Sequence, residues 1–429
     1  MLDIKFIKEN LELIAKNNSY RNTEVDLNRL MLIYDKKIKL QKELELWRTE
    51  KNKFSKTKPS IELTQKLKDL GKKIGEHESK IRLIDEEITN LLYQIPNLSL
   101  PDVPIGKNEN DNKIIRQVGQ KPNFNFKPKD HVELGKLHDI IDIETSAKVT
   151  GARFNYLKNQ AVWLQFALTN FAFDTLTNSE ILSEIIKKNN FKTTAKPFIP
   201  VIPPYMIKPE VYQKMGRLKF GDEDKYYLPK DNLYLIGSAE HTTGPMFMDY
   251  TFTEVELPQR FIAISPAFRR EAGSYGKDTK GILRVHQFDK IEIESFTLPE
   301  DSVIEQDFII AIQEYLLNKL NIPYQVIMVC TGDMGMPDAR QIDINCWMPG
   351  QNMYRETHTS DYMSDYQARR LNTKVKRNDG KVEYVHMNDA TVFAIGRMLI
   401  AIIENYQQSD GSIKVPEVLQ KYLNFSIIQ

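Results

Sequence analysis

The sequence contains little cysteine and no long apolar run. Its two cysteines, Cys330 and Cys346, have neither the CxxC spacing of a zinc site nor the dense, even pattern of a disulfide scaffold. We therefore expect a reducing, cytoplasmic environment. No apolar stretch approaches the roughly 20 residues that a membrane span needs. The N-terminal segment MLDIKFIKENLELIAKNN lacks the apolar core and cleavage site of a signal peptide, so no membrane association is expected.

The chain also lacks a large net charge and the glycine motifs of common nucleotide-binding folds. Its formal net charge is +1 over 429 residues, so any polyanionic partner must be met by local clusters of lysine and arginine. Neither GxGxxG nor GxxxxGK followed by Ser or Thr occurs, which argues against a Rossmann or P-loop domain. The length is sufficient for two or three domains, each with its own core.

The most regular pattern is a heptad repeat in the first hundred residues. Apolar side chains recur at alternating intervals of three and four in two runs, and only His77 interrupts the second run. The first run comprises Ile33, Leu40, Leu44, Trp47 and Phe54, with Lys37 and Lys51 in the other seam positions, and the second comprises Leu63, Leu67, Leu70, Ile74, Ile81, Ile84, Ile88, Leu91 and Ile95. Because a short segment with Pro59 joins the runs, we predict an antiparallel helical hairpin over about residues 28–95. A dimerising coiled coil is the alternative, and His77 is expected to be a tolerated seam residue rather than a ligand.

The first helix of this hairpin is rich in lysine. Residues 36–56 read KKIKLQKELELWRTEKNKFSK, whereas the charges of the second helix are nearly balanced. A run of charged residues usually forms a solvent-exposed helix face, but a rigid basic helix can also bind a nucleic-acid phosphate backbone. Residues 95–113, rich in Pro and Asn and containing Gly106, are typical of a linker. We therefore place an N-terminal domain at residues 1–105.

Beyond about Asn112 the pattern changes to short alternating strands between helices. Such strands, separated by loops of hairpin length, predict an α+β domain over residues 106–429, with an antiparallel sheet and flanking helices. Helices are expected over residues 161–178 and from Gly396 onward. A strand broken by prolines is expected over residues 198–208.

One predicted hairpin, FRREAGSYGKDTKGILRVHQFDKIEIE, carries many charges. Alternation along its second strand points Leu283, Val285, Ile291 and Ile293 to one face and Arg284, His286, Phe288, Lys290, Glu292 and Glu294 to the other. Arg269 and Glu271 are expected to share a face of the first strand, and a glycine-rich loop with Lys277 and Lys280 joins the two. Two interpretations stay open from the residues alone. The hairpin is either a surface element with scattered ion pairs or a nucleotide site, with arginines for phosphates and an aromatic ring for a base.

Several segments, in order along the chain, resemble the class II aminoacyl-tRNA synthetases. The charged hairpin is similar to their motif 2, and its EAGSYGKDTKG loop and HQF run resemble the bacterial-type seryl-tRNA synthetase family. Further similar segments are VIPPYMIK (201–208, motif 1), TGDMG (331–335), PGQNMYRETHT (349–359), YQARR (366–370) and GRMLIAIIENYQQSDGSIKVPEVLQKYL at the end. The heptad hairpin followed by IPNL also occupies the position that it has in this family.

The resemblance implies an enzyme that activates L-serine with ATP and then transfers serine to the 3′ end of tRNA(Ser), with tRNA(Sec) left open as a second acceptor. It further implies Mg²⁺, a hairpin that binds the tRNA, and a homodimer formed through the motif 1 segment. Two alternatives remain: relatives that charge carrier proteins, which usually lack the long hairpin, and a non-catalytic binding protein, which should have lost its phosphate ligands. A zinc-dependent seryl enzyme is disfavoured because neither cysteine lies in a ligand cluster.

By the same resemblance, individual residues receive roles. Arg269 is implied at the α-phosphate, Arg397 at the γ-phosphate and Glu356 at Mg²⁺, and these three carry the catalysis. The set implied for ATP is Arg269, Arg270, Glu271, Arg284, Val285, Phe288, Glu356, Thr357, His358, Thr359 and Arg397. The set implied for serine is Ser238, Ala239, Glu240, Arg269, Glu292, Asp389 and Thr391.

Three places depart from the family pattern. Ser238 stands where threonine is usual, Asp389 stands where asparagine is usual, and residues 241–252 differ from the usual apolar continuation. Asp389 exchanges an amide donor for a carboxylate beside the implied serine site. Capping of the last helix by Asp389 or Thr391 is the alternative.

Overall fold

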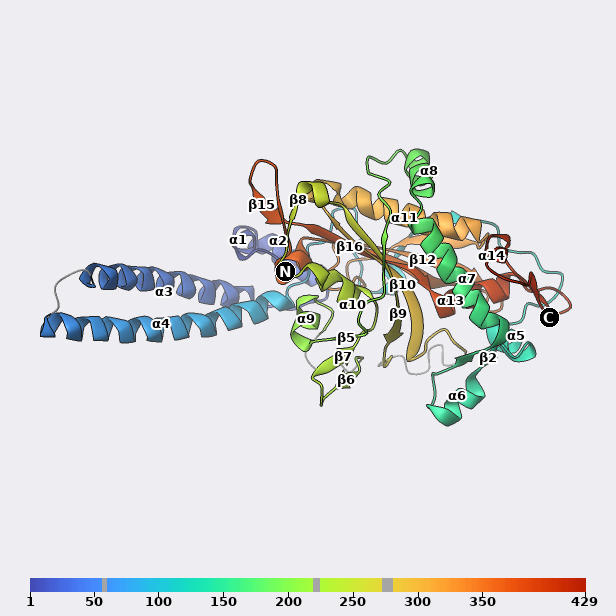
Figure 1. The fold of residues 1–429 in the computed structure, drawn as a ribbon, viewed down its shortest axis with the longest axis horizontal. Helices are drawn as coiled ribbons and strands as arrows, with labels where there is room; N and C mark the ends of the chain where they lie inside the picture. Colours follow the sequence, from blue (N-terminus) through green and yellow to red (C-terminus); the bar gives the residue numbers. More distant parts are fainter. Residues whose placement is uncertain (56–59, 219–223, 272–280) are drawn as a thin grey trace. The chain divides into compact units, whose positions relative to one another are not determined.

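The computed structural model describes residues 1–55, 60–218, 224–271 and 281–429. The chain divides into two compact units, Met1–Leu98 and Ser99–Gln429 (Figure 1). Residues 99–105, which the sequence analysis assigns to the N-terminal domain, fall in the second unit. There the Leu100 N–H donates to the Ala339 carbonyl at 2.9 Å.

The N-terminal unit contains four helices in its described residues. They are α1 (Ile4–Glu9), α2 (Leu11–Tyr20), α3 (Leu27–Phe54) and α4 (Ile61–Gln94). The side chains of Asp3, Asp26 and Ser60 accept from backbone N–H groups in the first turns of α1, α3 and α4. These caps satisfy donors that have no partner within the helix, so they fix where each helix begins.

Helices α3 and α4 lie side by side and antiparallel (Figure 1). Lys37 pairs with Asp85 at 2.6 Å, and Glu50, near the end of α3, pairs with Lys66, near the start of α4, at 3.5 Å. The buried seam comprises Leu30, Ile33, Leu44, Leu70, Ile74, Ile84, Ile88 and Leu92. The predicted helical hairpin is thus confirmed. His77 lies in this seam, where its Nε2 is 3.0 Å from the Glu43 carboxylate and its ring packs edge-on against Trp47.

The second unit is built on an eight-stranded sheet. Its order is β1 (Lys113–Val118), β11 (Tyr324–Met328), β12 (Arg340–Met348), β13 (Met353–Ser364), β16 (His386–Ala394), β10 (Gln287–Thr297), β9 (Gln259–Phe268) and β4 (Ile199–Val201). All neighbours pair antiparallel except β4 and β9, which are parallel. The predicted antiparallel sheet is confirmed.

Four helices close the core of this unit. They are α7 (Asn159–Leu176), α8 (Ser179–Asn189), α11 (Ser302–Lys319) and α13 (Ile395–Asn405). Three of them pack on the sheet, and α8 packs on α7 and α11. Helix α11 contacts β13 and β16, and α13 contacts β10 and β12. Their apolar side chains join those of the strands in one buried cluster. Helices α7 and α13 coincide, within two residues at their starts, with the helices predicted at 161–178 and from Gly396.

Short elements complete the unit. The helices are α5 (His131–Leu137), α6 (Ile143–Val149), α9 (Pro209–Lys214), α10 (Glu240–Thr243), α12 (Tyr366–Leu371) and α14 (Glu417–Gln420), with 3₁₀ turns at Glu109–Asp111, Gly244–Phe247, Glu254–Glu256 and Pro299–Asp301. The strands are β2 (Ile141–Asp142), β3 (Tyr156–Leu157), β5 (Met206–Ile207), β6 (Tyr227–Leu228), β7 (Leu233–Leu235), β8 (Thr251–Thr253), β14 (Lys374–Lys376), β15 (Val382–Tyr384), β17 (Ile413–Lys414) and β18 (Ile427–Ile428). The segment 198–208 therefore forms two strands, β4 and β5, as its prolines predict.

The charged hairpin departs from its predicted form. β9 ends at Phe268, so Arg269 and Glu271 are not neighbours on one face of a strand. The backbone of Glu271 has φ 52°, a left-handed conformation that breaks the pleat. Residues 272–280, with the predicted loop of Lys277 and Lys280, lie outside the described residues.

The second strand of this hairpin also begins later than predicted, at Gln287. At Gly281, with φ 76°, a Cβ would lie 1.9 Å from His131 Nε2, so only glycine fits there. Ile282 and Leu283 are consecutive yet both buried, so strict alternation fails before the strand starts. Within β10 the alternation of faces holds, since Ile291 and Ile293 join the apolar core while Glu292 and Glu294, although also buried, do not.

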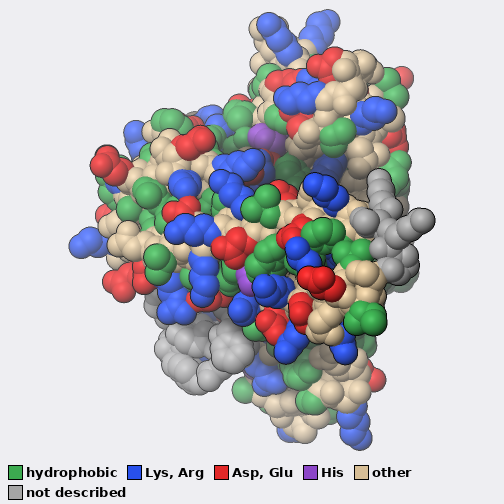
Figure 2. All heavy atoms as spheres, turned by 90° about the vertical axis from the view of Figure 1, so that its left-hand side faces the viewer, with side chains coloured by type: hydrophobic (Ala, Val, Ile, Leu, Met, Phe, Trp, Pro, Cys, Tyr) green, Lys and Arg blue, Asp and Glu red, His purple; other side chains and the backbone are tan. Residues whose placement is uncertain are grey.

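The surface mixes both signs of charge. Figure 2 shows lysine and arginine side chains interspersed with aspartate and glutamate over the face that it draws, in keeping with the near-zero net charge. In the described part of the chain, none of the helices combines the length and the apolar character that crossing a membrane requires.

Candidate active site

Side chains from the neighbouring strands β13, β16 and β10 and from the start of α13 surround one cavity of about 160 Å³. The six side chains on which the predicted site depends all line it: Arg269, Glu271, Phe288, Glu292, Glu356 and Arg397. Seven further predicted residues line it as well: Glu240, Arg284, Val285, Thr357, Thr359, Asp389 and Thr391. Segments far apart in the sequence therefore converge on one space.

One end of the cavity is rich in arginine. The Arg269 N–H donates to the His286 carbonyl at 3.0 Å, and its Nε donates to the Gly237 carbonyl at 3.1 Å. The Arg269 guanidinium also lies 5.5 Å from the centre of the Phe288 ring. These contacts hold the guanidinium in place beside an aromatic face, the geometry of a cation–π contact.

Two further arginines are paired with carboxylates at this end. Arg397 Nη1 lies 3.1 Å from Glu356 Oε1 and donates to the Glu356 carbonyl at 2.8 Å. Arg284 Nη1 lies 3.3 Å from Glu271 Oε2. Because both ion pairs are partly exposed to the cavity, an incoming anion can exchange contacts with their arginines.

The acids at this end have opposite pKa shifts. Burial alone would raise the pKa of Glu356, but Arg397, Arg269, Lys290 and Arg284 outweigh it, so its pKa is lowered and the carboxylate is ionised. Burial, followed by the negative charge of Glu356, raises the pKa of Asp343 to about 8. Asp343 Oδ1 accepts from the Thr359 hydroxyl at 3.0 Å, so a proton-holding carboxyl lies beside Thr359, within reach of the charge of Glu356.

The other end of the cavity is rich in carboxylates. Glu292 on β10 lies directly across from Thr391 on β16, and both line the cavity. Lys290 Nζ lies 2.5 Å from Glu292 Oε1 and donates to the Ser238 hydroxyl at 3.0 Å. Burial raises the pKa of Glu292 to about 7, although Lys290 opposes this shift.

Glu240 is a second buried acid at this end, positioned by the first turn of α10. Burial would raise its pKa, but its pKa is lowered and the carboxylate is ionised, because the positive charges of Lys290 and Arg217 act on it at neutral pH. His241 Nδ1 accepts from the Gly237 N–H at 3.1 Å, and its Nε2 lies 3.4 Å from Glu240 Oε1. Burial lowers the pKa of His241 to about 3, so it is neutral at physiological pH.

Asp389 does not cap the last helix. It lies within β16, and its Oδ2 accepts from Arg217 Nη2 at 2.9 Å. Thr391 lies in the same strand, and α13 begins without any side-chain cap. The capping alternative is therefore wrong for both residues.

Four predicted site residues do not line the cavity. The Arg270 guanidinium lies over the Tyr226 ring at 4.4 Å, and the His358 ring packs against Phe393 in the core. Ser238 is fully buried and reaches the site through Lys290, and Ala239 is buried at the start of α10. Residues 241–252, which were expected to alter the pocket wall, do not line the cavity either.

Comparison with known proteins places the chain in a family. Residues 1–99 match the seryl-tRNA synthetase N-terminal domain, and residues 224–406 match the class II tRNA synthetase core domain (G, H, P, S and T). The chain is 40% identical to a serine--tRNA ligase of Dictyoglomus turgidum, over 100% of this chain and 99% of that protein. It belongs to the seryl-tRNA synthetase family.

Similarity to solved structures leads to the same family. A seryl-tRNA synthetase from Pyrococcus horikoshii complexed with ATP is similar with a TM-score of 0.88 and 37% identity, over 100% of this chain and 99% of that one. A serine--tRNA ligase of Treponema denticola is 38% identical over 100% of both chains. As a member of the seryl-tRNA synthetase family, the chain is an ATP-binding aminoacyl-tRNA ligase with a class II core, which confirms the family and fold that the motifs imply.

Several residues of this site carry no recognisable signal in the sequence or were given no role from it. Lys290 stands on the polar face of the charged hairpin but received no role, although it links Ser238 to Glu292. Arg217 and Asp361 also line the cavity, and neither belongs to a recognisable pattern. The alternation of Phe288, Lys290 and Glu292 was the one available signal, since it placed Lys290 between two predicted site residues.

Proposed function

We propose that the chain activates L-serine with ATP to form seryl adenylate and pyrophosphate, and then transfers serine to tRNA(Ser). One observation carries the proposal: a cavity whose arginine-rich end adjoins an end lined by the carboxylates of Glu240 and Glu292. The first end suits a triphosphate and the second an ammonium group. The α-phosphate and the serine carboxylate then meet between them.

In the first step a serine carboxylate oxygen attacks the α-phosphorus, and the bond to the bridging oxygen of pyrophosphate breaks. Arg269 neutralises the charge that builds on the α-phosphate, and Arg397 holds the γ-phosphate. Phe288 stacks on the adenine, and Glu271 accepts from its amino group. The reaction needs position and charge neutralisation rather than a covalent nucleophile.

In the second step the terminal hydroxyl of the tRNA attacks the seryl carbonyl, and AMP leaves. The lysine-rich α3 supports the binding of an RNA backbone by the N-terminal unit. The resemblance leaves tRNA(Sec) open as a second acceptor.

Mg²⁺ belongs to the proposal through Glu356. This carboxylate is ionised, half exposed and lines the cavity beside Thr359. A hard cation that takes one or two carboxylates, phosphate oxygens and waters fits such a site. When bound, it neutralises phosphate charge during transfer, while Asp343 orients the Thr359 hydroxyl.

Serine is recognised through its ammonium and hydroxyl groups. Glu240 and Glu292 supply acceptors for the ammonium, and Thr391 lies close enough to the same end to meet the hydroxyl. A site built to hydrogen-bond a hydroxyl leaves its own groups unpaired when alanine enters, so it rejects alanine strongly. Threonine must be excluded by size.

We further propose a cytoplasmic homodimer formed through residues 201–208. Ile202, Tyr205 and Met206 in this segment are exposed in the single chain. Their burial against a second copy would remove apolar surface from water.

The test is amino-acid-dependent exchange of labelled pyrophosphate into ATP, with serine, threonine, alanine and cysteine compared. We expect serine to support exchange far above the other three, and folded protein without serine-dependent exchange would contradict the proposal. A variant lacking Met1–Leu98 should keep the exchange and lose transfer to tRNA(Ser). Transfer to a carrier protein by that variant would favour the alternative acceptor instead.

A further inference from the structure

Three carboxyl groups lie side by side across the sheet, at the serine end of the cavity. Glu294 on β10 is directly opposite Asp389 on β16, and Asp389 is directly opposite Asp361 on β13. Their exposed fractions are 1%, 4% and 6%. Like charges in directly opposed positions destabilise a sheet, and burial makes each charge costlier. A row of this kind therefore needs a cation.

Arg217 supplies that cation from outside the sheet, in the segment that follows α9. Its Nη2 lies 2.9 Å from Asp389 Oδ2, 3.2 Å from Asp361 Oδ2 and 3.6 Å from Asp338 Oδ1. Burial would lower the pKa of Arg217, but Asp338, Asp389 and Asp361 raise it. One guanidinium nitrogen, Nη2 of Arg217, thus lies within ion-pair distance of three carboxylates.

The same arginine belongs to the wall of the cavity. Arg217, Asp361 and Asp389 line it together with Glu240 and Thr391. The charge state of Asp389 consequently decides what the wall offers to an amino acid. An ionised carboxylate only accepts hydrogen bonds, whereas a protonated one also donates.

We propose that Arg217 is a positioning residue for amino-acid selection, which holds Asp389 ionised and oriented toward the amino-acid end of the cavity. The inference rests on the proposed function and deepens it. This role of Arg217 also explains how Asp389 can stand at a position where the family usually has asparagine. The carboxylate is accommodated because a guanidinium from another segment is bound to it.

The charges around Asp389 support this role. Burial raises the pKa of Asp389 to about 6, and Arg217 is the group that lowers it most. The other charged groups that face Asp389 are acids. Each either raises the pKa of Asp389 or has its own pKa raised by Asp389. They are Glu240 from α10, Asp338 from the loop before β12, Asp361 from β13, and Glu292 and Glu294 from β10. Without Arg217, Asp389 should hold its proton at neutral pH.

A double-mutant cycle with Arg217→Gln and Asp389→Asn tests the proposal. The KM for serine and the KM for ATP are measured separately in the pyrophosphate exchange assay. We expect R217Q to raise the serine KM about tenfold in the wild-type background but less than about threefold in the D389N background, because the two residues are coupled. The ATP KM should stay within about twofold throughout.

The pH profile separates an electrostatic role from a merely structural one. In R217Q, kcat/KM for serine should rise at higher pH than in the wild type, because Asp389 must lose a proton whose pKa is now higher. Adding D389N should remove this alkaline displacement. Arg217→Lys keeps the charge and should leave the profile in place, even where R217Q does not fold.

Arg369→Gln is the matched control. Arg369 forms a half-buried ion pair with Asp365 at 2.7 Å and does not line the cavity, so neither KM should change. Equal effects of R217Q in both backgrounds, or a displaced profile in R217K, would overturn the inference. Absence of serine-dependent exchange in the wild type would instead overturn the proposed function, so the two failures are distinguishable.

Discussion

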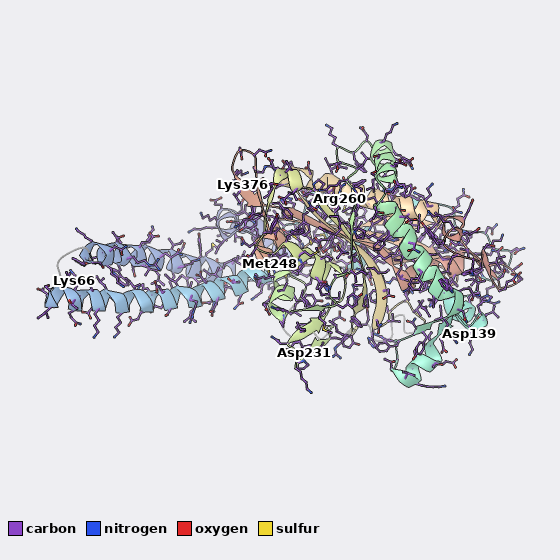
Figure 3. The ribbon with its side chains drawn as sticks, viewed as in Figure 1. Lys66, Asp139, Asp231, Met248, Arg260 and Lys376 are labelled. Atoms are coloured by element: carbon purple, nitrogen blue, oxygen red, sulfur yellow. The ribbon has the colours of Figure 1, made fainter. Side chains whose placement is uncertain are left out.

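The two units of the molecule use charge in different ways, as two residues labelled in Figure 3 illustrate. Lys66 in the helical hairpin lies 3.5 Å from Glu50, and both side chains are about half exposed. Arg260 on β9 is fully buried, and its Nε and Nη2 donate to the two oxygens of Glu305 on α11 at 2.6 and 2.7 Å. The ion pairs of the hairpin therefore stay in contact with solvent, whereas the sheet domain, besides exposed pairs such as Lys136 with Glu144, also holds charges on fully internal partners.

This difference follows from what holds each unit together. The hairpin depends on an apolar seam, and exposed ion pairs beside it contribute little because water and salt screen them. In the sheet domain charged groups lie within the core and around the cavity, where screening is weak and an unpaired charge is costly. The hairpin can thus offer charge to an external polyanion, and the sheet domain can hold charge against small reactants.

The largest effect is expected at the cavity. Arg269→Gln should lower the rate of serine-dependent pyrophosphate exchange by about 100- to 1,000-fold, because it removes a cation placed at the developing charge. The same substitution at Arg48, in an exposed pair of the hairpin with Glu78 at 2.7 Å, should leave exchange unchanged. Equal losses in the two variants would contradict the division between the units.

A second comparison concerns stability. Glu305→Gln leaves Arg260 buried beside a neutral partner and should cost about 3–5 kcal/mol in the free energy of unfolding. Glu78→Gln removes the partner of Arg48 in the hairpin and should cost less than about 1 kcal/mol. Urea unfolding monitored by circular dichroism measures both, and a similar cost for both would show that burial does not set the value of these pairs.

A third prediction addresses the hairpin charges directly. Lys36, Lys39 and Lys42 are exposed on α3. Their replacement by glutamine should raise the KM for tRNA about tenfold and flatten its dependence on salt, because fewer phosphates are neutralised. Pyrophosphate exchange, which needs no tRNA, serves as the internal control and should not change.

The smallest expected effect is a pH dependence of Mg²⁺ binding. Because Asp343 holds a proton below a pKa of about 8, a cation at Glu356 should favour release of that proton. The apparent affinity for Mg²⁺ should therefore rise severalfold between about pH 6 and pH 8 and level off above. Asp343→Asn should flatten this dependence, and an unchanged slope would rule out the coupling.

The same shift has a consequence for folding. In the absence of metal the folded state keeps the Asp343 proton up to about pH 8, whereas an unfolded chain releases it near pH 4. The contribution of Asp343 to stability should accordingly decrease as the pH rises through that interval.

Some parts of the molecule were predictable because their signal is local. The heptads of α3 and α4 repeat every few residues, so the hairpin followed from the sequence. On β10 the alternation of Phe288, Lys290 and Glu292 against Ile291 and Ile293 identified both faces correctly. The motifs added the remaining site residues, such as Glu356 and Arg397, through their resemblance to a family.

Other predictions failed where the backbone leaves its regular path. Arg269 and Glu271 were assigned to one strand face, but β9 ends before them and Glu271 turns into the left-handed region. Both side chains nevertheless reach the cavity. His358 was assigned to ATP through the resemblance to the family, although its ring packs in the core against Phe393.

By itself the sequence determined the helical hairpin, the antiparallel sheet and most side chains of the cavity, because periodicity and motifs are properties of short segments. Only the tertiary structure decided that Arg217 meets Asp389, a residue 172 positions away. It likewise decided that Glu294, Asp389 and Asp361 form one row. Such contacts depend on strand register and on a segment outside the sheet, so no local sequence pattern shows which buried charged groups will contact each other.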